Sequence, residues 1–296
     1  MKNIAVIGGG TMGNGIAQVF ATAGFKVNLI DISTSSLLQA ELNIHKNLDR
    51  LIAKDKLSLA QKPNIINNIH FTSDLEKGVT DTFLVVEAIA ENILFKEKLF
   101  NQLDKFTDNE CILASNTSSI SITTLASFTC KPGKVIGMHF MNPVPIMPLV
   151  EIIPGLLTEK NVTDKVIEIS ILLNKKPLVV SDFPGFISNR ILMPMINEAI
   201  LSLQEKVAGV YEIDQIMKLG MAHPMGPLQL ADYIGLDVCL SILNVLKDGF
   251  GNPKYAPAVL LVNMVKAGKL GAKSGEGFYK YDDLKKISGI STLFAN

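Results

Sequence analysis

A histidine and a carboxylate flank a proline-rich segment near the middle of this 296-residue chain. His139 ends an apolar run, and Glu151 stands inside the next apolar run, after Pro143 and Pro145. Proline fixes φ and holds the residue before it in extended geometry, which predicts a stiff loop between two strands. If the two strands are neighbours, Glu151 reaches one imidazole nitrogen while the other faces a substrate. The alternative is a buried histidine bonded to a carbonyl group, with an exposed glutamate.

A glycine motif follows the first predicted strand, Ile4 to Ile7. The motif reads Gly8-Gly9-Gly10-Thr11-Met12-Gly13, and apolar residues at helical spacing come after it. This is G-x-G-x-x-G between a strand and a helix. Gly8 permits the tight turn, Gly10 lets a pyrophosphate approach the backbone, and Gly13 lets the helix pack on the strand. The pattern predicts a dinucleotide site.

An acidic residue, Asp31, stands at the end of the second predicted strand. An acid at this position accepts hydrogen bonds from the adenosine ribose and repels a 2′-phosphate. The sequence therefore favours NAD over NADP. The alternative interpretation is a glycine turn with a solvated aspartate cap.

Small polar residues cluster where a later buried strand ends. They are Ser115-Asn116-Thr117-Ser118-Ser119, directly after the apolar run from 111 to 114. The carboxyl ends of strands are where a doubly wound sheet holds its ligands, although the same residues can cap the helix that follows. Before this cluster, the strand from Thr82 to Ile89 leads to Glu91 and to a helix with Lys96.

A basic stripe marks the helix that follows Asp31. Lys46, Arg50 and Lys54 recur every four residues and are predicted to share one helix face. A solvated face is the ordinary explanation for such a stripe. The functional alternative is that a phosphate-rich ligand lies along it.

Composition excludes several classes of function. Lys plus Arg and Asp plus Glu number 28 each, so no global field recruits nucleic acid or an acidic membrane. No apolar run approaches the roughly 18 residues of a membrane helix, and no signal peptide is expected before the first strand. No Cys/His cluster has zinc spacing, so no metal is expected. The three cysteines, at positions 111, 130 and 239, are predicted to be reduced core thiols of a cytoplasmic protein.

The pattern of elements predicts two domains. Strands and helices alternate up to residue 183, as in a Rossmann-type, doubly wound, mostly parallel sheet, here with a helical hairpin inserted after Asp31. Residues 184–296 read as an all-α domain that begins with a long helix interrupted by Pro194. A helical domain this small and apolar predicts a homodimer.

Seven motifs taken together resemble the L-3-hydroxyacyl-CoA dehydrogenase family, and most of all its short-chain bacterial members, which act on 3-hydroxybutyryl-CoA. The resemblance covers essentially the whole chain. The motifs are Gly8-x-Gly10-x-x-Gly13, Val86-Glu87-Ala88, Ser115 to Ser119, His139-Phe140-Met141-Asn142-Pro143, Pro184-Gly185-Phe186-Ile187-x-Asn189-Arg190, Pro224-Met225-Gly226-Pro227 and Gly275-Glu276-Gly277-Phe278-Tyr279.

The resemblance implies a role for each matching residue. His139 would be the catalytic base and Glu151 its partner, with Ser118 and Asn189 at the reacting oxygen. Coenzyme A would lie along the basic stripe at Arg50 and Lys54, with Ser118 also touching the substrate. The implied NAD contacts are Gly8, Gly10, Thr11, Met12, Gly13, Asp31, Glu91, Lys96, Ser118, Asn142 and Lys273.

One position departs from the family, because Pro148 stands where lysine is usual. The departure bears on affinity and leaves the His139–Glu151 chemistry intact. The expected activity is reversible, NAD-dependent oxidation of an L-3-hydroxyacyl-CoA by a stand-alone homodimeric enzyme. Two alternatives stay open: an NAD-dependent dehydrogenase of a non-CoA hydroxy acid or sugar acid, and a non-catalytic NAD-binding relative such as a lens crystallin.

Overall fold

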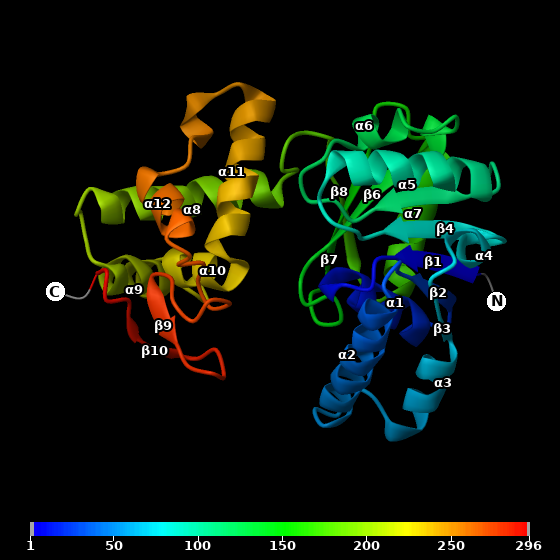
Figure 1. Ribbon diagram of the computed structural model, residues 1–296, viewed down its shortest axis with the longest axis horizontal. Helices are drawn as coiled ribbons and strands as arrows, with labels where there is room; N and C mark the ends of the chain where they lie inside the picture. Colours follow the sequence, from blue (N-terminus) through cyan, green and yellow to red (C-terminus); the bar gives the residue numbers. More distant parts are fainter. Residues whose placement is uncertain (1–2, 295–296) are drawn as a thin grey trace. The chain divides into compact units, whose positions relative to one another are not determined.

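The computed structural model describes residues 3–294, and the chain divides into two compact units (Figure 1). Unit 1 comprises Met1–Phe183 and unit 2 comprises Pro184–Asn296. Each unit has a hydrophobic core of its own. The chain therefore has the two cores that its length and apolar composition predict.

Unit 1 is built on an eight-stranded sheet with the order β3-β2-β1-β4-β5-β6-β7-β8. Neighbouring strands are parallel except β6 and β7, which are antiparallel. The central strands are buried on both faces, which is why they read as continuous apolar runs. This confirms the predicted Rossmann-type sheet. The strands are β1 (Asn3–Ile7), β2 (Lys26–Ile30), β3 (Ile69–Thr72), β4 (Thr82–Glu87), β5 (Ile112–Ser115), β6 (Val135–Phe140), β7 (Leu149–Pro154) and β8 (Lys176–Val179).

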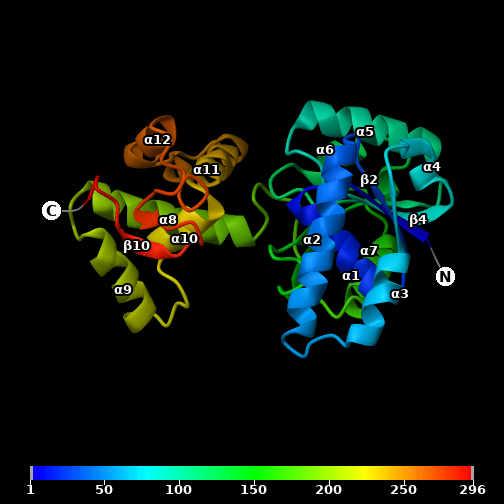
Figure 2. The same ribbon diagram turned by 60° about the horizontal axis from the view of Figure 1, so that its bottom comes forward.

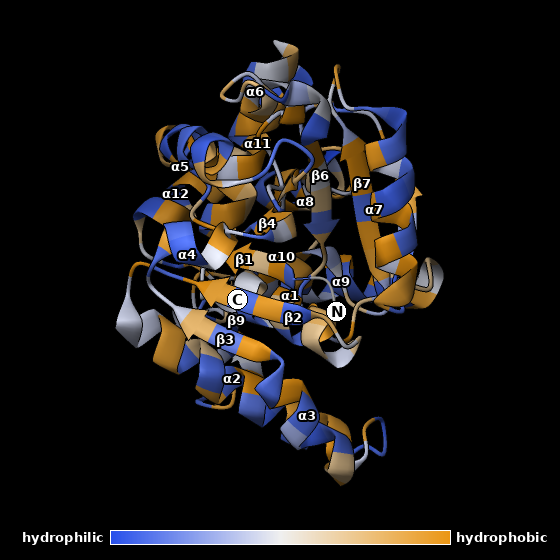
Figure 3. Cartoon of the chain, turned by 90° about the vertical axis from the view of Figure 1, so that its right-hand side faces the viewer, coloured by the Kyte–Doolittle hydropathy of each residue, from blue (hydrophilic) through white to orange (hydrophobic). Residues whose placement is uncertain are grey.

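Helices cover both faces of this sheet, with α4, α5 and α6 on one side and α1 and α7 on the other (Figure 3). The apolar strands between them form the core of unit 1. The helices are α1 (Thr11–Thr22), α2 (Thr34–Ile52), α3 (Lys62–Asn67), α4 (Leu75–Val79), α5 (Ile93–Phe106), α6 (Ile122–Ala126) and α7 (Lys160–Leu172).

Helices α2 and α3 form the predicted hairpin insertion between β2 and β3 (Figure 2). One stripe of α2 is buried, at Leu37, Ala40, Ile44 and Leu48, because these residues recur every three or four positions. One local expectation was wrong: helix α2 ends at Ile52, so Lys54 lies beyond it and not on its face. Pro63 stands in the first turn of α3, where a proline loses no helical hydrogen bond.

Unit 2 is mainly helical, as predicted, and adds a small antiparallel sheet of β9 (Tyr279–Tyr281) and β10 (Ile287–Ile290). Its helices are α8 (Ser188–Gln204), α9 (Val210–Gly220), α10 (Pro227–Ile234), α11 (Leu236–Phe250) and α12 (Val259–Lys266). Helices α10 and α11 meet at Gly235 with a bend of 97° between them. Gly235 has φ of +102°, a conformation that favours glycine and ends a helix.

Two buried carboxylates fix the small sheet to the helices of unit 2. Asp232 on α10 accepts hydrogen bonds from the backbone amides of Phe278 and Tyr279, at 3.0 and 2.9 Å. Asp214 on α9 accepts from the Tyr279 hydroxyl at 2.8 Å and from the backbone N–H of Leu228 at 2.8 Å. Burial raises the pKa of Asp232 to about 6, although these hydrogen bonds lower it. The small sheet is therefore anchored to α9 and α10 by hydrogen bonds to two buried carboxyl groups.

The three cysteines differ in burial. Cys111 and Cys239 are buried thiols, as predicted, but Cys130 is exposed. Cys130 lies in a polar turn that follows α6, so it is not packed into the core.

No single helix within residues 3–294 is long and apolar enough to cross a membrane. Helices α10 and α11 together have the length and the composition of a membrane span, but they are bent at the break between them.

Candidate active site

The glycine loop between β1 and α1 has the shape that a dinucleotide needs. Gly8 has φ of +107°, and a Cβ there would lie 2.5 Å from the Ala88 carbonyl oxygen. A Cβ on Gly13 would lie 1.7 Å from the Gly8 carbonyl oxygen, so only glycine lets α1 pack here. A Cβ on Gly10 would meet no atom of the protein within 4 Å. The space beside Gly10 is thus open to a pyrophosphate at the helix N-terminus.

Asp31 is held at the end of β2, beside this loop. Its Oδ2 atom accepts a hydrogen bond from the Gly9 amide at 2.7 Å, and its Oδ1 atom accepts from the Ser33 amide at 2.9 Å. Both bonds orient the carboxylate at the mouth of the glycine loop, where an adenosine ribose would lie in a dinucleotide fold. The geometry therefore fits NAD.

A cavity of about 510 Å³ opens beside Asp31 and continues the site. Its walls include Ile32, Phe95, Lys98 and Gln102. Ile32 is 97% exposed, so no residue from 3 to 294 covers this apolar side chain. An amphipathic cavity next to Asp31 has the lining that an adenine ring would need. Sequence reasoning did not select these four residues, although an isoleucine directly after Asp31 was a usable signal.

A buried ion-pair network lies under the carboxyl ends of β4 and β5. The Lys96 ammonium lies 2.7 Å from Oε1 of Glu87 and 3.1 Å from Oε2 of Glu91. Lys96 is 1% exposed and Glu87 is fully buried. Ser115 donates its hydroxyl to Glu87 at 2.5 Å. The structure thus places Lys96, a predicted NAD contact, within this network.

Glu91 joins the network to the serine-rich loop. Its Oε1 atom accepts hydrogen bonds from the amides of Ser118 and Ser119, both at 3.0 Å, and from the Thr117 hydroxyl at 2.5 Å. Burial raises the pKa of Glu91, but the Lys96 charge and the hydroxyl donors outweigh it and hold that pKa below its ordinary value. An ionised Glu91 therefore fixes the backbone on which Ser118 stands.

His139 and Glu151 face each other across the only antiparallel pair that the described part of the large sheet contains. The register sets them directly opposite, and Nδ1 of His139 lies 2.8 Å from Oε2 of Glu151. Both side chains are buried, at 8% and 2% exposure. The two strands are neighbours, which meets the condition that the sequence set for this pair. Because the carboxylate pairs with Nδ1, the tautomer with a proton there leaves the lone pair on Nε2.

The loop after β6 is tied to the serine-rich loop. Asn116 accepts a hydrogen bond from the Phe140 amide through its Oδ1 atom, at 2.9 Å. Sequence reasoning included Asn116 only as a member of the polar cluster. The bond keeps the residue after His139 next to the loop that carries Ser118, so two predicted catalytic residues belong to connected segments.

A basic groove runs between α2 and the loop that follows His139. One cavity of about 240 Å³ is lined by Thr11, Lys46, Arg50 and Asn142, among others. A second, of about 290 Å³, is lined by Asn47, Arg50, Leu51, Lys54, Pro143, Pro145 and Ile146. The cavities share Arg50, Asn47 and two prolines. Arg50 and Lys54 therefore line one surface, even though Lys54 lies beyond the helix.

Two predicted site residues belong to unit 2. Asn189 lies in the first turn of α8 and is 9% exposed, and its amide donates to the Gly185 carbonyl at 3.2 Å. Lys273 forms an ion pair of 2.5 Å with Asp237 at the start of α11. No group of three or more His, Cys, Asp or Glu side chains within residues 3–294 could hold a metal ion.

Comparison with protein families identifies both halves of the chain. Residues 3–183 match the NAD-binding domain of 3-hydroxyacyl-CoA dehydrogenase, and residues 185–281 match the C-terminal domain of the same enzyme. The chain belongs to the 3-hydroxyacyl-CoA dehydrogenase family. Membership identifies NAD as the cofactor of this protein and its activity as that of an oxidoreductase.

Named relatives of this dehydrogenase agree over nearly their full length. A probable 3-hydroxybutyryl-CoA dehydrogenase from Deinococcus radiodurans is 55% identical, covering 93% of this chain and 99% of its own. One from Bacillus subtilis is 49% identical, covering 96% and 98%. The crystal structure of (S)-3-hydroxybutyryl-CoA dehydrogenase from Ralstonia eutropha, 46% identical, superposes with a TM-score of 0.92 and covers 96% of this chain and 100% of its own.

Proposed function

We propose that this enzyme catalyses the reversible, NAD-dependent oxidation of a short-chain L-3-hydroxyacyl-CoA, with 3-hydroxybutyryl-CoA as its substrate. The observation that carries the proposal is the contact of 2.8 Å between His139 and Glu151, at the edge of the sheet where the glycine loop opens. A histidine held in one tautomer by a carboxylate is suited to general acid–base catalysis. The names of the bacterial relatives support the choice of substrate.

His139 would act through Nε2, which takes the proton of the 3-hydroxyl group. Glu151 accepts the Nδ1 hydrogen and stabilises the imidazolium that forms. In the reverse direction the imidazolium returns the proton to the oxygen. Bound NAD supplies the acceptor for the hydride that leaves C3. Ser118 and Asn189 are proposed as hydrogen-bond donors to the oxygen as its charge changes.

Coenzyme A is proposed to lie in the groove between α2 and the loop after His139. Arg50 and Lys54 line this groove, and none of the described residues that line its two cavities carries a carboxylate. A guanidinium and an ammonium are suited to the phosphate groups of coenzyme A. Turnover with acetoacetyl-CoA should far exceed turnover with acetoacetate, measured as NADH oxidation. Equal rates would favour a dehydrogenase of free hydroxy acids, and the absence of any turnover would favour the crystallin-like alternative.

The groove is tested by removing its charges. The double variant Arg50→Ala/Lys54→Ala should raise KM for acetoacetyl-CoA about tenfold or more with little change in kcat, because the phosphates are bound equally in ground and transition states. Lys160→Ala is the matched control, since Lys160 is an exposed cation on α7 that pairs with Asp164. An unchanged KM for acetoacetyl-CoA in the double variant would contradict the proposal that coenzyme A binds in this groove.

The remaining NAD contacts are proposed from the same arrangement. Asp31 would bind the adenosine ribose, and Asn142 would approach the cofactor from the loop after His139. Glu91 and Lys96 would act through the serine-rich loop that they hold, and Lys273 would contribute from unit 2. Thr11 and Met12 would present their backbone at the start of α1, where donors face the pyrophosphate.

A homodimer through unit 2 is part of the proposal. Helix α9 exposes Tyr211, Ile216 and Leu219, the last at 83%, which is an unusual set of apolar side chains for a solvent-facing helix. Sedimentation equilibrium should give twice the chain mass, and Leu219→Glu should shift the equilibrium toward the monomer. A cytoplasmic location and a role in fatty-acid β-oxidation are proposed on the basis of the bacterial relatives.

A further inference from the structure

The loop between β6 and β7, residues 141–148, forms one wall of the basic groove. Pro143, Pro145 and Ile146 line the groove from this loop. Ile146 is 60% exposed, so the side chains that face the groove are not fixed by burial in a core. The position of this wall therefore depends on how the loop itself is held.

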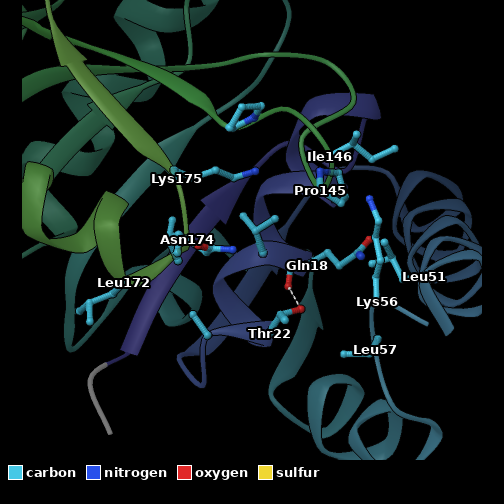
Figure 4. Close-up of a pocket in the computed structure, with 14 residues that line it drawn as sticks. Gln18, Thr22, Leu51, Lys56, Leu57, Pro145, Ile146, Leu172, Asn174 and Lys175 are labelled. Carbon is cyan, nitrogen blue, oxygen red and sulfur yellow. Dashed lines mark hydrogen bonds between the residues drawn. The ribbon is translucent and has the colours of Figure 1, made fainter. Parts of the chain in front are cut away.

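Behind the same loop lies another cavity, of about 570 Å³ (Figure 4). Its walls are the C-terminal half of α1, the residues that follow α2, and the turn between α7 and β8. Pro145 and Ile146 line this cavity as well as the groove. The loop is consequently a thin partition with space on both sides. A partition of this kind has few packing contacts to resist displacement.

Three sets of contacts hold the partition. Val144 is 2% exposed and packs against Gly15, where even a Cβ would approach the valine to 2.9 Å. The amides of Ile146 and Met147 donate to the Pro143 carbonyl, both at 3.0 Å, which closes a local turn. The third set comes from the start of β8, where the Lys176 amide donates to the Pro148 carbonyl at 2.7 Å and the side chain of Lys175 makes the remaining bonds.

Lys175 precedes β8 and points toward the loop beside Pro145 and Ile146 (Figure 4). Its ammonium donates to the Val144 carbonyl at 2.5 Å and to the Met147 carbonyl at 2.8 Å. These carbonyls bracket the two residues that line both cavities. The lysine thus fastens the partition on each side of its groove-facing part.

The surroundings of Lys175 are unusual for a lysine. Its side chain is 8% exposed, and within residues 3–294 no carboxylate oxygen lies within 4.0 Å of its ammonium. Burial lowers the pKa of Lys175. Burying a charge without a counter-ion is unfavourable, so an apolar side chain would satisfy packing alone at lower cost. Packing alone therefore does not account for a cation at this position, whereas its two bonds to the loop carbonyls do.

We infer that Lys175 is a positioning residue for acyl-CoA binding, which holds the 144–147 segment so that Pro145 and Ile146 form the wall of the groove. The inference rests on the proposed groove for coenzyme A. It assigns Lys175 no contact with the substrate or with NAD. Its loss should change substrate binding through the shape of the groove.

Lys175→Met tests this inference, because methionine keeps most of the volume and removes the donor. KM for acetoacetyl-CoA should rise about tenfold with kcat within about twofold of the parent enzyme, while the NADH dissociation constant stays unchanged. Lys131 offers a matched control. Its ammonium also donates to two backbone carbonyls, those of Thr107 at 3.1 Å and Asp108 at 2.8 Å. These carbonyls lie in the segment that precedes β5, whereas the serine-rich loop follows the other end of β5.

Lys131→Met should lower the melting temperature and leave unchanged both the KM for acetoacetyl-CoA and the NADH dissociation constant. If Lys175→Met behaves in the same way, or lowers kcat with KM unchanged, Lys175 does not position the groove. Should Lys175→Met not fold, Lys175→Gln carries the same expectation, because its single short amide does not span both carbonyls. An unchanged KM for acetoacetyl-CoA in Arg50→Ala would contradict the binding of coenzyme A in this groove. A raised KM in Arg50→Ala together with an unchanged KM in the Lys175 variants would overturn only the role of Lys175.

Discussion

Nδ1 of His139 lies 2.8 Å from Oε2 of Glu151, and the two residues are exact partners in the register of β6 and β7. Glu151→Gln keeps the shape of the side chain and removes its charge. An amide can present its NH₂ group to the imidazole and favour the wrong tautomer. We expect kcat to fall by about 10²-fold or more, with NADH affinity nearly intact, in steady-state and fluorescence measurements. Asp164→Asn on the exposed face of α7 is the control, and unchanged turnover in Glu151→Gln would exclude the pair.

Gly10→Ala should separate cofactor binding from folding. A Cβ on Gly10 meets no protein atom within 4 Å and the residue has φ of −64°, so the chain should fold with its melting temperature nearly unchanged. The methyl group would occupy the space beside the helix N-terminus, and NADH affinity should fall about tenfold or more in a fluorescence titration. Gly289→Ala, equally open but in β10, should alter neither quantity. Normal NADH binding by Gly10→Ala would contradict the assignment of the pyrophosphate to this loop.

Asp31 should determine the preference between the two nicotinamide cofactors. A carboxylate at the ribose repels a 2′-phosphate, so the parent enzyme should use NADH at least about tenfold better than NADPH by kcat/KM. Asp31→Ala should narrow this ratio, mainly by weakening NADH binding. Glu76→Ala on α4 is a control for the loss of one exposed acid. A parent enzyme that prefers NADPH would contradict the assignment of Asp31.

Asp232 should make stability depend on pH. Burial raises its pKa from 3.8 to about 6, so the folded chain binds this proton more tightly than the unfolded chain. The resulting stability is fully present below about pH 4 and is lost as pH rises through about 6, a change of about 3 kcal/mol. In urea unfolding between pH 4 and 7, Asp232→Asn should lack this loss. Its stability relative to the parent enzyme should therefore rise with pH.

A control for that measurement is Asp248→Asn, which removes an exposed carboxyl group of α11. Its unfolding free energy should follow that of the parent enzyme at every pH. A constant difference between Asp232→Asn and the parent across this range would mean that Asp232 keeps an ordinary affinity for protons in the folded chain.

Sequence patterns predicted the parts of the site that depend on local order along the chain. The glycine loop was readable because its spacing, the strand before it and the helix after it are all local. The pairing of His139 with Glu151 was readable because a stiff loop joins two apolar runs, and neighbouring strands are the simplest way to connect them. The resemblance to the family then gave a role to Ser118 and Asn189, which their spacing alone did not.

Features that depend on contacts distant in sequence were not predicted. The burial of Lys96 follows from Glu87, nine residues earlier on another element, and from the packing of α5 over the sheet. The β9–β10 pair is anchored by Asp232, which binds backbone amides 46 and 47 residues away. Cys130 was expected in the core, yet it lies exposed between Thr129 and Lys131 in the bend that follows α6. Propensity is a weak guide where such contacts decide.

The antiparallel pairing of β6 and β7 limits which insertions this part of the chain can accept. Successive side chains of a strand point to opposite faces, so a shift of β7 by one residue would turn the carboxylate of position 151 away from the imidazole. Two kinds of insertion should consequently have different fates during evolution. Residues added within the connecting loop leave the strand register intact, whereas one residue added inside β7 separates the acid from its base.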